Sequence, residues 1–91
     1  MSEFKAILEP IAELLEKKNK DYGNSYYLLR EEFGPVAFYV RVMDKYHRIR
    51  QLDQGGASVE NESVIDTLKD IVGYCALEIK YRQRWRCNDL T

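Results

Sequence analysis

Residues 62–74, ESVIDTLKDIVGY, predict a mostly buried helix that carries three carboxylates along one stripe. Glu62, Asp66 and Asp70 recur at every fourth residue, so they fall within roughly 80° of one another, and Gly73 lies in the same arc. Like charges four residues apart repel, and a glycine inside a helix costs about 1 kcal/mol relative to alanine. The stripe therefore predicts a partner against it, which is a divalent metal ion, a basic helix or the backbone of another element.

The rest of the chain predicts further helices and no strand. Apolar residues recur at the three- and four-residue spacing of amphipathic helices. Pro10 is expected to kink the first helix or to mark a shift in its start, and Ser25 can cap the second. Gly34-Pro35 breaks the chain, and Gly55-Gly56 lies in a loop over 53–61. We expect an all-α fold in a single domain over 1–91, with three main helices and one short helix, at residues 3–19, 26–33, 35–52 and 61–84.

The helix expected over 35–52 is apolar around most of its circumference, which is typical of a helix that is central or buried in an oligomer. A chain of 91 residues is at the small end of what can bury its own core. Because three or four helices of this size rarely bury enough apolar surface, we expect oligomerisation to complete the bundle, as a homodimer or a larger homo-oligomer.

The composition excludes several classes of protein. A formal charge of −1 argues against a surface built for nucleic acid or for anionic membranes. No apolar run approaches the roughly 18 to 20 residues of a membrane span, and the first residues do not resemble a signal peptide. The two cysteines, Cys75 and Cys87, form no plausible disulfide framework or metal pair. We therefore expect a cytoplasmic protein.

A second stripe, mainly basic, lies on the helix over 35–52 and is expected to face the acidic stripe; its members are Arg41, Asp44, Lys45 and Arg48. One interpretation is a magnesium-dependent phosphate site, since Mg²⁺ prefers carboxylate oxygens and is completed by waters and substrate phosphates. Its ligands would be Asp44, Glu62, Asp66 and Asp70, and phosphates would be bound by Arg41, Lys45 and Arg48. The other interpretation is an interhelical ion-pair network, in which Arg41 and Arg48 neutralise Asp66 and Asp70 with no ligand.

A further candidate segment is KKNKDYG, residues 17–23. Lys20 and Asp21 at the end of a helix are placed to reach a nucleotide phosphate or its metal, and Tyr22 to stack on a base. The same residues also suit an ordinary helix end, because lysines in the last turn interact favourably with the helix dipole. One of several other tyrosines could also cover a nucleobase, the candidates being Tyr26, Tyr27, Tyr39, Tyr46 and Tyr74.

Residues 80–86, KYRQRWR, interleave cations and aromatic rings as nucleic-acid binders do. Cations are also electrostatically favoured at the C-terminus of a helix, so this pattern has a structural explanation as well. We do not expect a nucleic acid to be the ligand.

Three ordered motifs resemble the small helical "nucleotide modification associated" domain of phages and bacteria. They are KNKDYG at 18–23, RVMDKYHR at 41–48, and ESVIDTLKDI at 62–71 followed by Gly73-Tyr74. The chain more loosely resembles the all-α nucleoside triphosphate pyrophosphatases of the MazG and dimeric dUTPase type. Those enzymes hold Mg²⁺ on acidic residues of two antiparallel helices and cleave a nucleoside triphosphate to a monophosphate and pyrophosphate.

The looser resemblance implies catalytic roles for Glu62 and Asp66 and a metal-binding role for Asp44. The chain departs from that superfamily, because Arg41 stands where the first helix has its first acid, and because Glu62 and Asp66 are one residue further apart than the corresponding acids. An arginine in place of an acid is expected where a phosphate-binding fold keeps its ligand and loses a metal ion.

The sequence therefore predicts an oligomeric nucleotide-handling protein in the cytoplasm of a bacterium or a phage-infected bacterial cell. The favoured activity is Mg²⁺-dependent nucleoside triphosphate pyrophosphohydrolysis. One alternative is a non-catalytic protein that binds and sequesters a nucleotide in phage–host conflict. Another is a structural adaptor whose apolar helix recruits a second protein.

Overall fold

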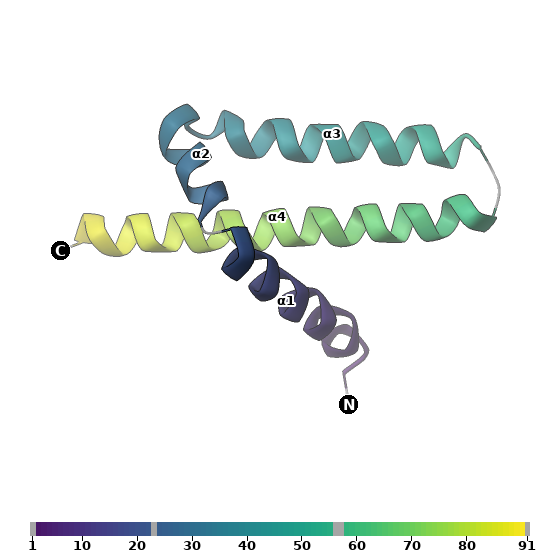
Figure 1. Ribbon diagram of the computed structural model, residues 1–91, viewed down its shortest axis with the longest axis horizontal. Helices are drawn as coiled ribbons and strands as arrows, with labels where there is room; N and C mark the ends of the chain where they lie inside the picture. Colours follow the sequence, from purple (N-terminus) through teal and green to yellow (C-terminus); the bar gives the residue numbers. More distant parts are fainter. Residues whose placement is uncertain (1, 23, 56–57, 91) are drawn as a thin grey trace.

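The computed structural model describes the backbone of residues 2–22, 24–55 and 58–90, and the side chains of residues 2–20, 24–55 and 63–84. Four helices follow one another along the chain (Figure 1), namely α1 (Glu3–Tyr22), α2 (Ser25–Phe33), α3 (Val36–Asp53) and α4 (Ser58–Leu90). The described residues include no strand, so the predicted all-α fold with three main helices and one short helix is confirmed.

The frame of the molecule is a hairpin in which α3 and α4 lie side by side and run antiparallel (Figure 1). The short α2 lies at one end of this hairpin, and α1 crosses α4 near the middle of its length (Figure 1). The three helix pairs that pack most extensively are α3 with α4, α2 with α3 and α1 with α4, so each of them includes α3 or α4. This arrangement places the second half of α1, the start of α2 and the middle of the hairpin around one point.

The turn between α2 and α3 requires a glycine and a proline in that order. Gly34 has a φ of 74°, in the left-handed region, and its N–H donates to the carbonyl of Arg30 at 2.9 Å, which ends α2. Pro35 has a helical φ of −59°, and its carbonyl accepts the N–H groups of Phe38 and Tyr39 at the start of α3. The dipeptide that the sequence identifies as a break is therefore the joint between two helices.

The long helices extend beyond their predicted ends. α1 continues through Pro10 as one helix and ends three residues after Asn19, and α4 begins at Ser58 and continues six residues beyond Arg84. These extra residues are mostly polar and show no apolar period, but an existing helix propagates readily into such neighbours. The predicted loop over 53–61 is correspondingly shorter.

The start of α2 also differs from the prediction. Ser25 is the first residue of the helix and not its cap, because Asn24 occupies the cap position, where its side chain makes no capping hydrogen bond. The helix is fixed instead by contacts further along its length.

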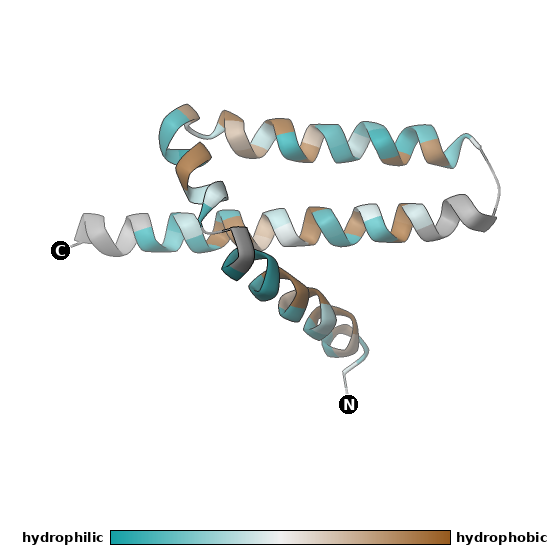
Figure 2. Ribbon diagram, viewed as in Figure 1, coloured by the Kyte–Doolittle hydropathy of each residue, from teal (hydrophilic) through white to brown (hydrophobic). Residues whose placement is uncertain are grey.

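Little of the chain is buried. Among the described side chains, the buried hydrophobic ones are Ile11, Tyr26 and Tyr81, and none is fully buried. The radius of gyration is 15.2 Å, against about 12 Å for a compact chain of this length. α3, all of whose residues are described, has no buried residue. Hydrophobic residues recur along α3 and in the first half of α1 (Figure 2). α3 packs on α4 along one side only, and hydrophobic side chains on its other side stay exposed, among them Val40 and Met43.

None of the described helices combines the length and the apolar character that crossing a bilayer would require.

Candidate functional site

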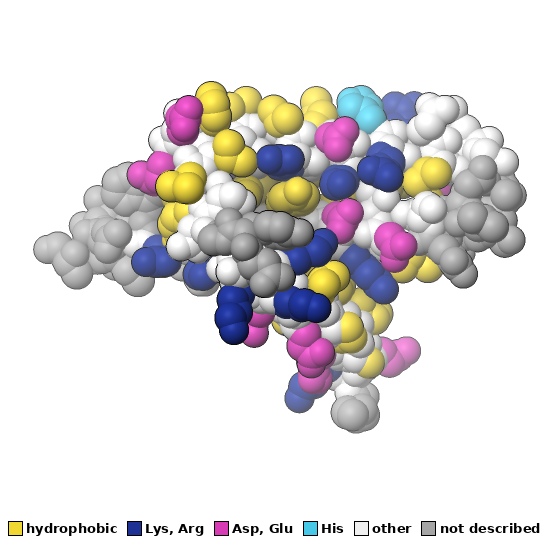
Figure 3. Space-filling view, viewed as in Figure 1, with side chains coloured by type: hydrophobic (Ala, Val, Ile, Leu, Met, Phe, Trp, Pro, Cys, Tyr) yellow, Lys and Arg dark blue, Asp and Glu magenta, His cyan; other side chains and the backbone are white. Residues whose placement is uncertain are grey.

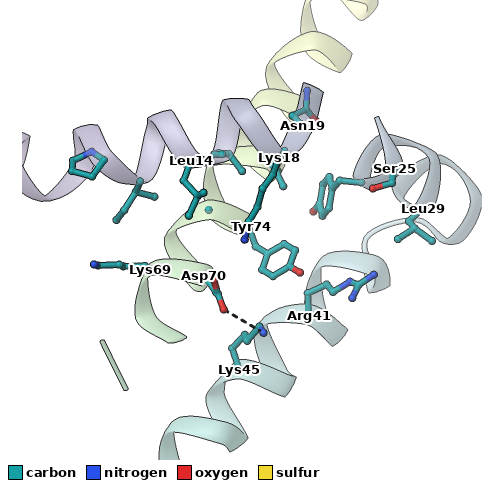
Figure 4. A pocket seen from close by; sticks show the side chains of 16 residues that line it. Leu14, Lys18, Asn19, Ser25, Leu29, Arg41, Lys45, Lys69, Asp70 and Tyr74 are labelled. Carbon is teal, nitrogen blue, oxygen red and sulfur yellow. Dashed lines mark ion pairs between the residues drawn. The ribbon is translucent and has the colours of Figure 1, made fainter. Parts of the chain in front are cut away.

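A cavity of about 520 Å³ lies where α1 crosses the α3–α4 hairpin (Figure 4). All four helices contribute to its walls, with mostly apolar side chains from α1 and charged ones from the end of α1, from α3 and from α4. Its volume is within the range of roughly 300 to 1,000 Å³ that is usual for small-molecule sites.

The charged side chains in the cavity wall are mainly cationic. Among the described residues that line it, four are cations and one is a carboxylate, namely Lys18, Arg41, Lys45, Lys69 and Asp70. The carboxylate pairs with one cation, with 3.4 Å between Lys45 Nζ and Asp70 Oδ2 (Figure 4). The side chain of Asp70 is 45% exposed, so solvent weakens this ion pair. A surplus of cations in a protein with a net charge of −1 indicates an anionic ligand.

Two tyrosines line the same cavity. The ring centroids of Tyr26 and Tyr74 are 6.3 Å apart, and the guanidinium carbon of Arg41 lies 5.9 Å from the centroid of the Tyr74 ring. In Figure 4, Tyr74 lies between Lys18 of α1 and Arg41 of α3. A flat aromatic face between two cations offers a surface for a planar ring together with donors for its phosphates.

Gly73 forms part of the cavity wall where α1 crosses α4. A Cβ atom at this position would meet Leu15 Cδ1 at 3.8 Å, which is an ordinary van der Waals distance. Packing among the described residues therefore has room for an alanine here and does not account for the glycine.

The structure brings together some of the residues that the sequence identifies and separates others. Arg41, Lys45 and Asp70 line the cavity, whereas four predicted residues are exposed and do not line it, namely Lys20, Asp44, Arg48 and Asp66. The side chains of Asp21, Tyr22 and Glu62 lie outside the described residues. In the part of the chain whose side chains are described, no three His, Cys, Asp or Glu residues form a group that could hold a metal ion.

The acidic and basic stripes that the sequence predicts are joined by an ion pair, but the cation in that pair is not one of the two predicted. The sequence predicts Arg41 and Arg48 as partners of Asp66 and Asp70, and the structure joins Lys45 to Asp70. Helix geometry explains the exchange, because position 45 lies closer than positions 41 and 48 to the face of α3 that packs on α4. Arg41 instead extends toward the ring of Tyr74.

A largely buried polar cluster, with Arg82 at its exposed edge, joins α2 to α4, and the sequence did not predict it. We name it the α2–α4 clamp, and its members are Tyr26, Arg30, Glu78 and Arg82. Arg30 donates from Nε to Glu78 Oε1 and from Nη2 to Glu78 Oε2, both at 2.9 Å, and the two side chains are 9% and 7% exposed. Tyr26 donates to Glu78 Oε1 at 2.6 Å, and Arg82 Nε donates to Oε2. One carboxylate thus accepts hydrogen bonds from three side chains.

The clamp fixes the charge of its members. Burial by itself raises the pKa of Glu78, but the hydrogen bonds from Arg30, Tyr26 and Arg82 outweigh it and lower this pKa from 4.5 to about 2. Burial and then the hydrogen bond to Glu78 raise the pKa of Tyr26. The carboxylate is therefore ionised and the phenol neutral at physiological pH, and Tyr26 is held at the edge of the cavity.

A sequence signal for the clamp exists in its spacing. Tyr26 and Arg30 are four residues apart, as are Glu78 and Arg82, so each pair shares one face of its helix. The spacing within each helix does not predict that the two faces contact each other, because the two residue pairs are about fifty residues apart in the chain.

Comparison with known proteins follows this geometry. A family model described as "nucleotide modification associated domain 1" matches residues 18–79, about two thirds of the chain. The matched segment contains every charged and tyrosine residue of the cavity wall named above, together with Tyr26, Arg30 and Glu78 of the clamp. No curated protein and no solved structure matches the chain.

Proposed function

The chain belongs to the nucleotide modification associated domain 1 family, and from that membership we propose that the cavity between α1 and the α3–α4 hairpin binds a nucleotide. The observation that supports this proposal most strongly is the surplus of cations around an aromatic ring in one cavity. A polyphosphate matches the cations, and a nucleobase matches the flat face of a tyrosine.

In this proposal the phosphates lie toward Arg41 and Lys18. Arg41 offers a planar fork of N–H donors that suits phosphate oxygens, and Lys18 and Lys69 add positive charge from α1 and α4. Lys45 contributes less, because Asp70 already neutralises it. The base or the ribose then lies against Tyr74, whose ring borders the same space.

Mg²⁺ enters this proposal as the companion of a nucleotide polyphosphate. Mg²⁺ is commonly bound by one or two carboxylates, several waters and substrate phosphates, and Asp70 is the one described carboxylate in the cavity wall. The donor set fits that mode of binding. It does not by itself form a cage of several protein ligands, because the exposed Asp44 and Asp66 do not line the cavity.

Mg²⁺-dependent pyrophosphohydrolysis of a nucleoside triphosphate is the second candidate. Asp66 lies one turn before Asp70 on α4, and bound Mg²⁺ would polarise a phosphoryl group and lower the pKa of an attacking water. This candidate requires Asp44, Glu62 and Asp66 to act together with Asp70. Binding without turnover requires only the residues that already line the cavity, so we favour nucleotide binding over hydrolysis. In this proposal the protein acts as an oligomer in the cytoplasm of a bacterium or a phage-infected cell.

A ligand panel separates the two candidates. Mono-, di- and triphosphate nucleotides and cyclic nucleotides are added to the purified protein with Mg²⁺ or with EDTA, and the melting temperature and the products are measured. We expect a nucleotide to raise the melting temperature and to be recovered intact, because a ligand stabilises the state that binds it. Release of pyrophosphate from a nucleotide in the presence of Mg²⁺ but not of EDTA would support the hydrolase. If no nucleotide raised the melting temperature, both candidate functions would be contradicted.

A matched pair of variants tests the cavity itself. Lys69 and Lys80 are both exposed lysines of α4, but only Lys69 lines the cavity. Lys69→Ala is expected to weaken nucleotide binding several-fold and Lys80→Ala to leave it unchanged. Equal effects of the two variants would contradict the placement of the site.

A further inference from the structure

One face of α3 is apolar, exposed and continuous. We name it the outer stripe, and its members are Val36, Tyr39, Val40, Met43 and Tyr46, which are 49%, 56%, 59%, 59% and 51% exposed. Their three- and four-residue spacing places them on one side of the helix. The opposite side contains the partly buried Phe38, Val42 and Ile49, which pack toward α4. α3 therefore has two apolar faces, and this chain covers only one of them.

We propose that a second copy of this chain docks antiparallel against the outer stripe. The amount of exposed surface supports a large partner: the chain exposes 7415 Å², against about 5,500 Å² expected for a compact protein of 10.8 kDa. A stable interface covers roughly 800 Å² on each partner. Five half-exposed apolar side chains supply several hundred Å² of that area, and much of the rest can come from their neighbours on α2 and α3.

The charge distribution along the stripe identifies a second copy as the partner. The end next to α2 carries the exposed carboxylates of Glu31 and Glu32, of which Glu31 also accepts a hydrogen bond from Tyr81. The half of α3 away from α2 carries the exposed Arg50 on the same face as the stripe. Figure 3 shows hydrophobic side chains along the edge formed by α3 and acidic groups at its α2 end, with a further acidic group beside the histidine and basic groups on both sides of it. An antiparallel pair places the acidic end of each copy beside the basic half of the other, whereas a parallel pair would bring like charges together.

Symmetry then fixes which residues meet. A two-fold axis makes a patch contact itself, and Met43 is at the middle of the stripe, seven residues from Val36 and seven from Arg50. Met43 would face the partner's Met43, and Val36 would lie opposite the partner's Arg50. His47 is exposed beside this seam, with its ring 5.6 Å from the ring of Tyr46.

The test begins with the mass of the full chain in solution, measured by sedimentation equilibrium. Wild type is expected to be a dimer. Met43→Glu and Met43→Lys are each expected to be monomers, because like charges would meet at the axis. An equal mixture of these two variants is expected to form a heterodimer, which removes general misfolding as an explanation. A monomeric wild type, or a mixture that stays monomeric, would overturn the proposal.

A control variant separates this face from the other apolar surface of the molecule. Phe4 on α1 is 73% exposed, so Phe4→Glu introduces the same charge on a different helix. The dimer is expected to survive Phe4→Glu. Its dissociation, with the Met43 variants still dimeric, would assign the interface to α1 and overturn the proposal.

Crosslinking tests the orientation in a background that carries Cys75→Ser and Cys87→Ser. A short bismaleimide is expected to join two copies of Met43→Cys, and to join Val36→Cys to Arg50→Cys in a mixture. Val36→Cys alone is expected to stay uncrosslinked, because antiparallel copies hold these positions roughly 20 Å apart along the helix. Efficient crosslinking of Val36→Cys to itself would show a parallel pair and overturn the proposal.

Discussion

The α2–α4 clamp and the cavity are neighbours that use charge in opposite ways. In the clamp, a single carboxylate accepts hydrogen bonds from two arginines and a tyrosine, and the Arg30 and Glu78 side chains are less than one tenth exposed. In the cavity wall, four cations surround one carboxylate, and the ion pair that forms is long and open to water. Tyr26 belongs to both regions.

The comparison distinguishes charged groups that stabilise the fold, as in the clamp, from charged groups that are available to a ligand, as in the cavity. A buried charge is costly unless it is fully paired, and the clamp meets that condition within the chain. Three of the four cations in the cavity wall are exposed, namely Lys18, Arg41 and Lys69, and among the described residues that line the cavity only Asp70 can neutralise them. The clamp therefore holds two helices together, and the cavity wall keeps a surplus of positive charge that suits the proposed anionic ligand.

The largest effect is expected from breaking the clamp. Arg30→Ala leaves the Glu78 carboxylate buried without its bidentate partner, and removing one member of such a pair typically costs about 3–5 kcal/mol. Urea unfolding at a fixed protein concentration measures the loss. Replacing both charges, with Arg30→Met and Glu78→Leu, is expected to recover only part of it, because the buried Tyr26 hydroxyl then loses its acceptor. A destabilisation below about 1 kcal/mol for Arg30→Ala would show that the pair is not a structural element.

A smaller effect is expected from pH, again at the clamp. The folded pKa of Glu78, about 2, is below its ordinary value of 4.5, so the unfolded chain binds this proton more readily. The resulting stability is complete above about pH 5 and is lost as the pH falls from 4.5 toward 2, and it amounts to about 3 kcal/mol. In urea titrations between pH 6 and 2, the stability gap between wild type and Glu78→Gln is expected to narrow by that amount. A constant gap would contradict the assignment.

The smallest effect is expected from Gly73→Ala in the cavity wall. The added methyl group meets Leu15 at an ordinary distance, and replacing a glycine inside a helix with alanine typically contributes about 0.5–1 kcal/mol. Thermal unfolding is therefore expected to shift upward by a few degrees. A lower melting temperature would show that Gly73 is required by a contact outside one copy of the chain.

The sequence predicted features that depend on spacing within one helix, and it did not predict those that depend on how two helices cross. Apolar spacing along each helix identified the fold class and the order of the helices, and helix faces brought Arg41, Lys45 and Asp70 to one site. Periodicity does not state how one helix crosses another. Lys18 reaches the cavity, and Lys20 does not line it, because of where α1 crosses α4. The clamp was missed because Arg30 and Glu78 meet across 48 residues.

The most direct test of nucleotide binding compares two arginines of α3 by calorimetric titration with a nucleotide from the panel. Arg41 lines the cavity beside Tyr74, whereas Arg48, which the sequence also assigns to phosphate, is exposed outside it. Arg41→Ala is expected to weaken binding by about tenfold or more, as expected for the loss of a charge-assisted hydrogen bond, and Arg48→Ala to leave it nearly unchanged. An unchanged affinity for Arg41→Ala, or the reverse order of the two variants, would contradict nucleotide binding in this cavity.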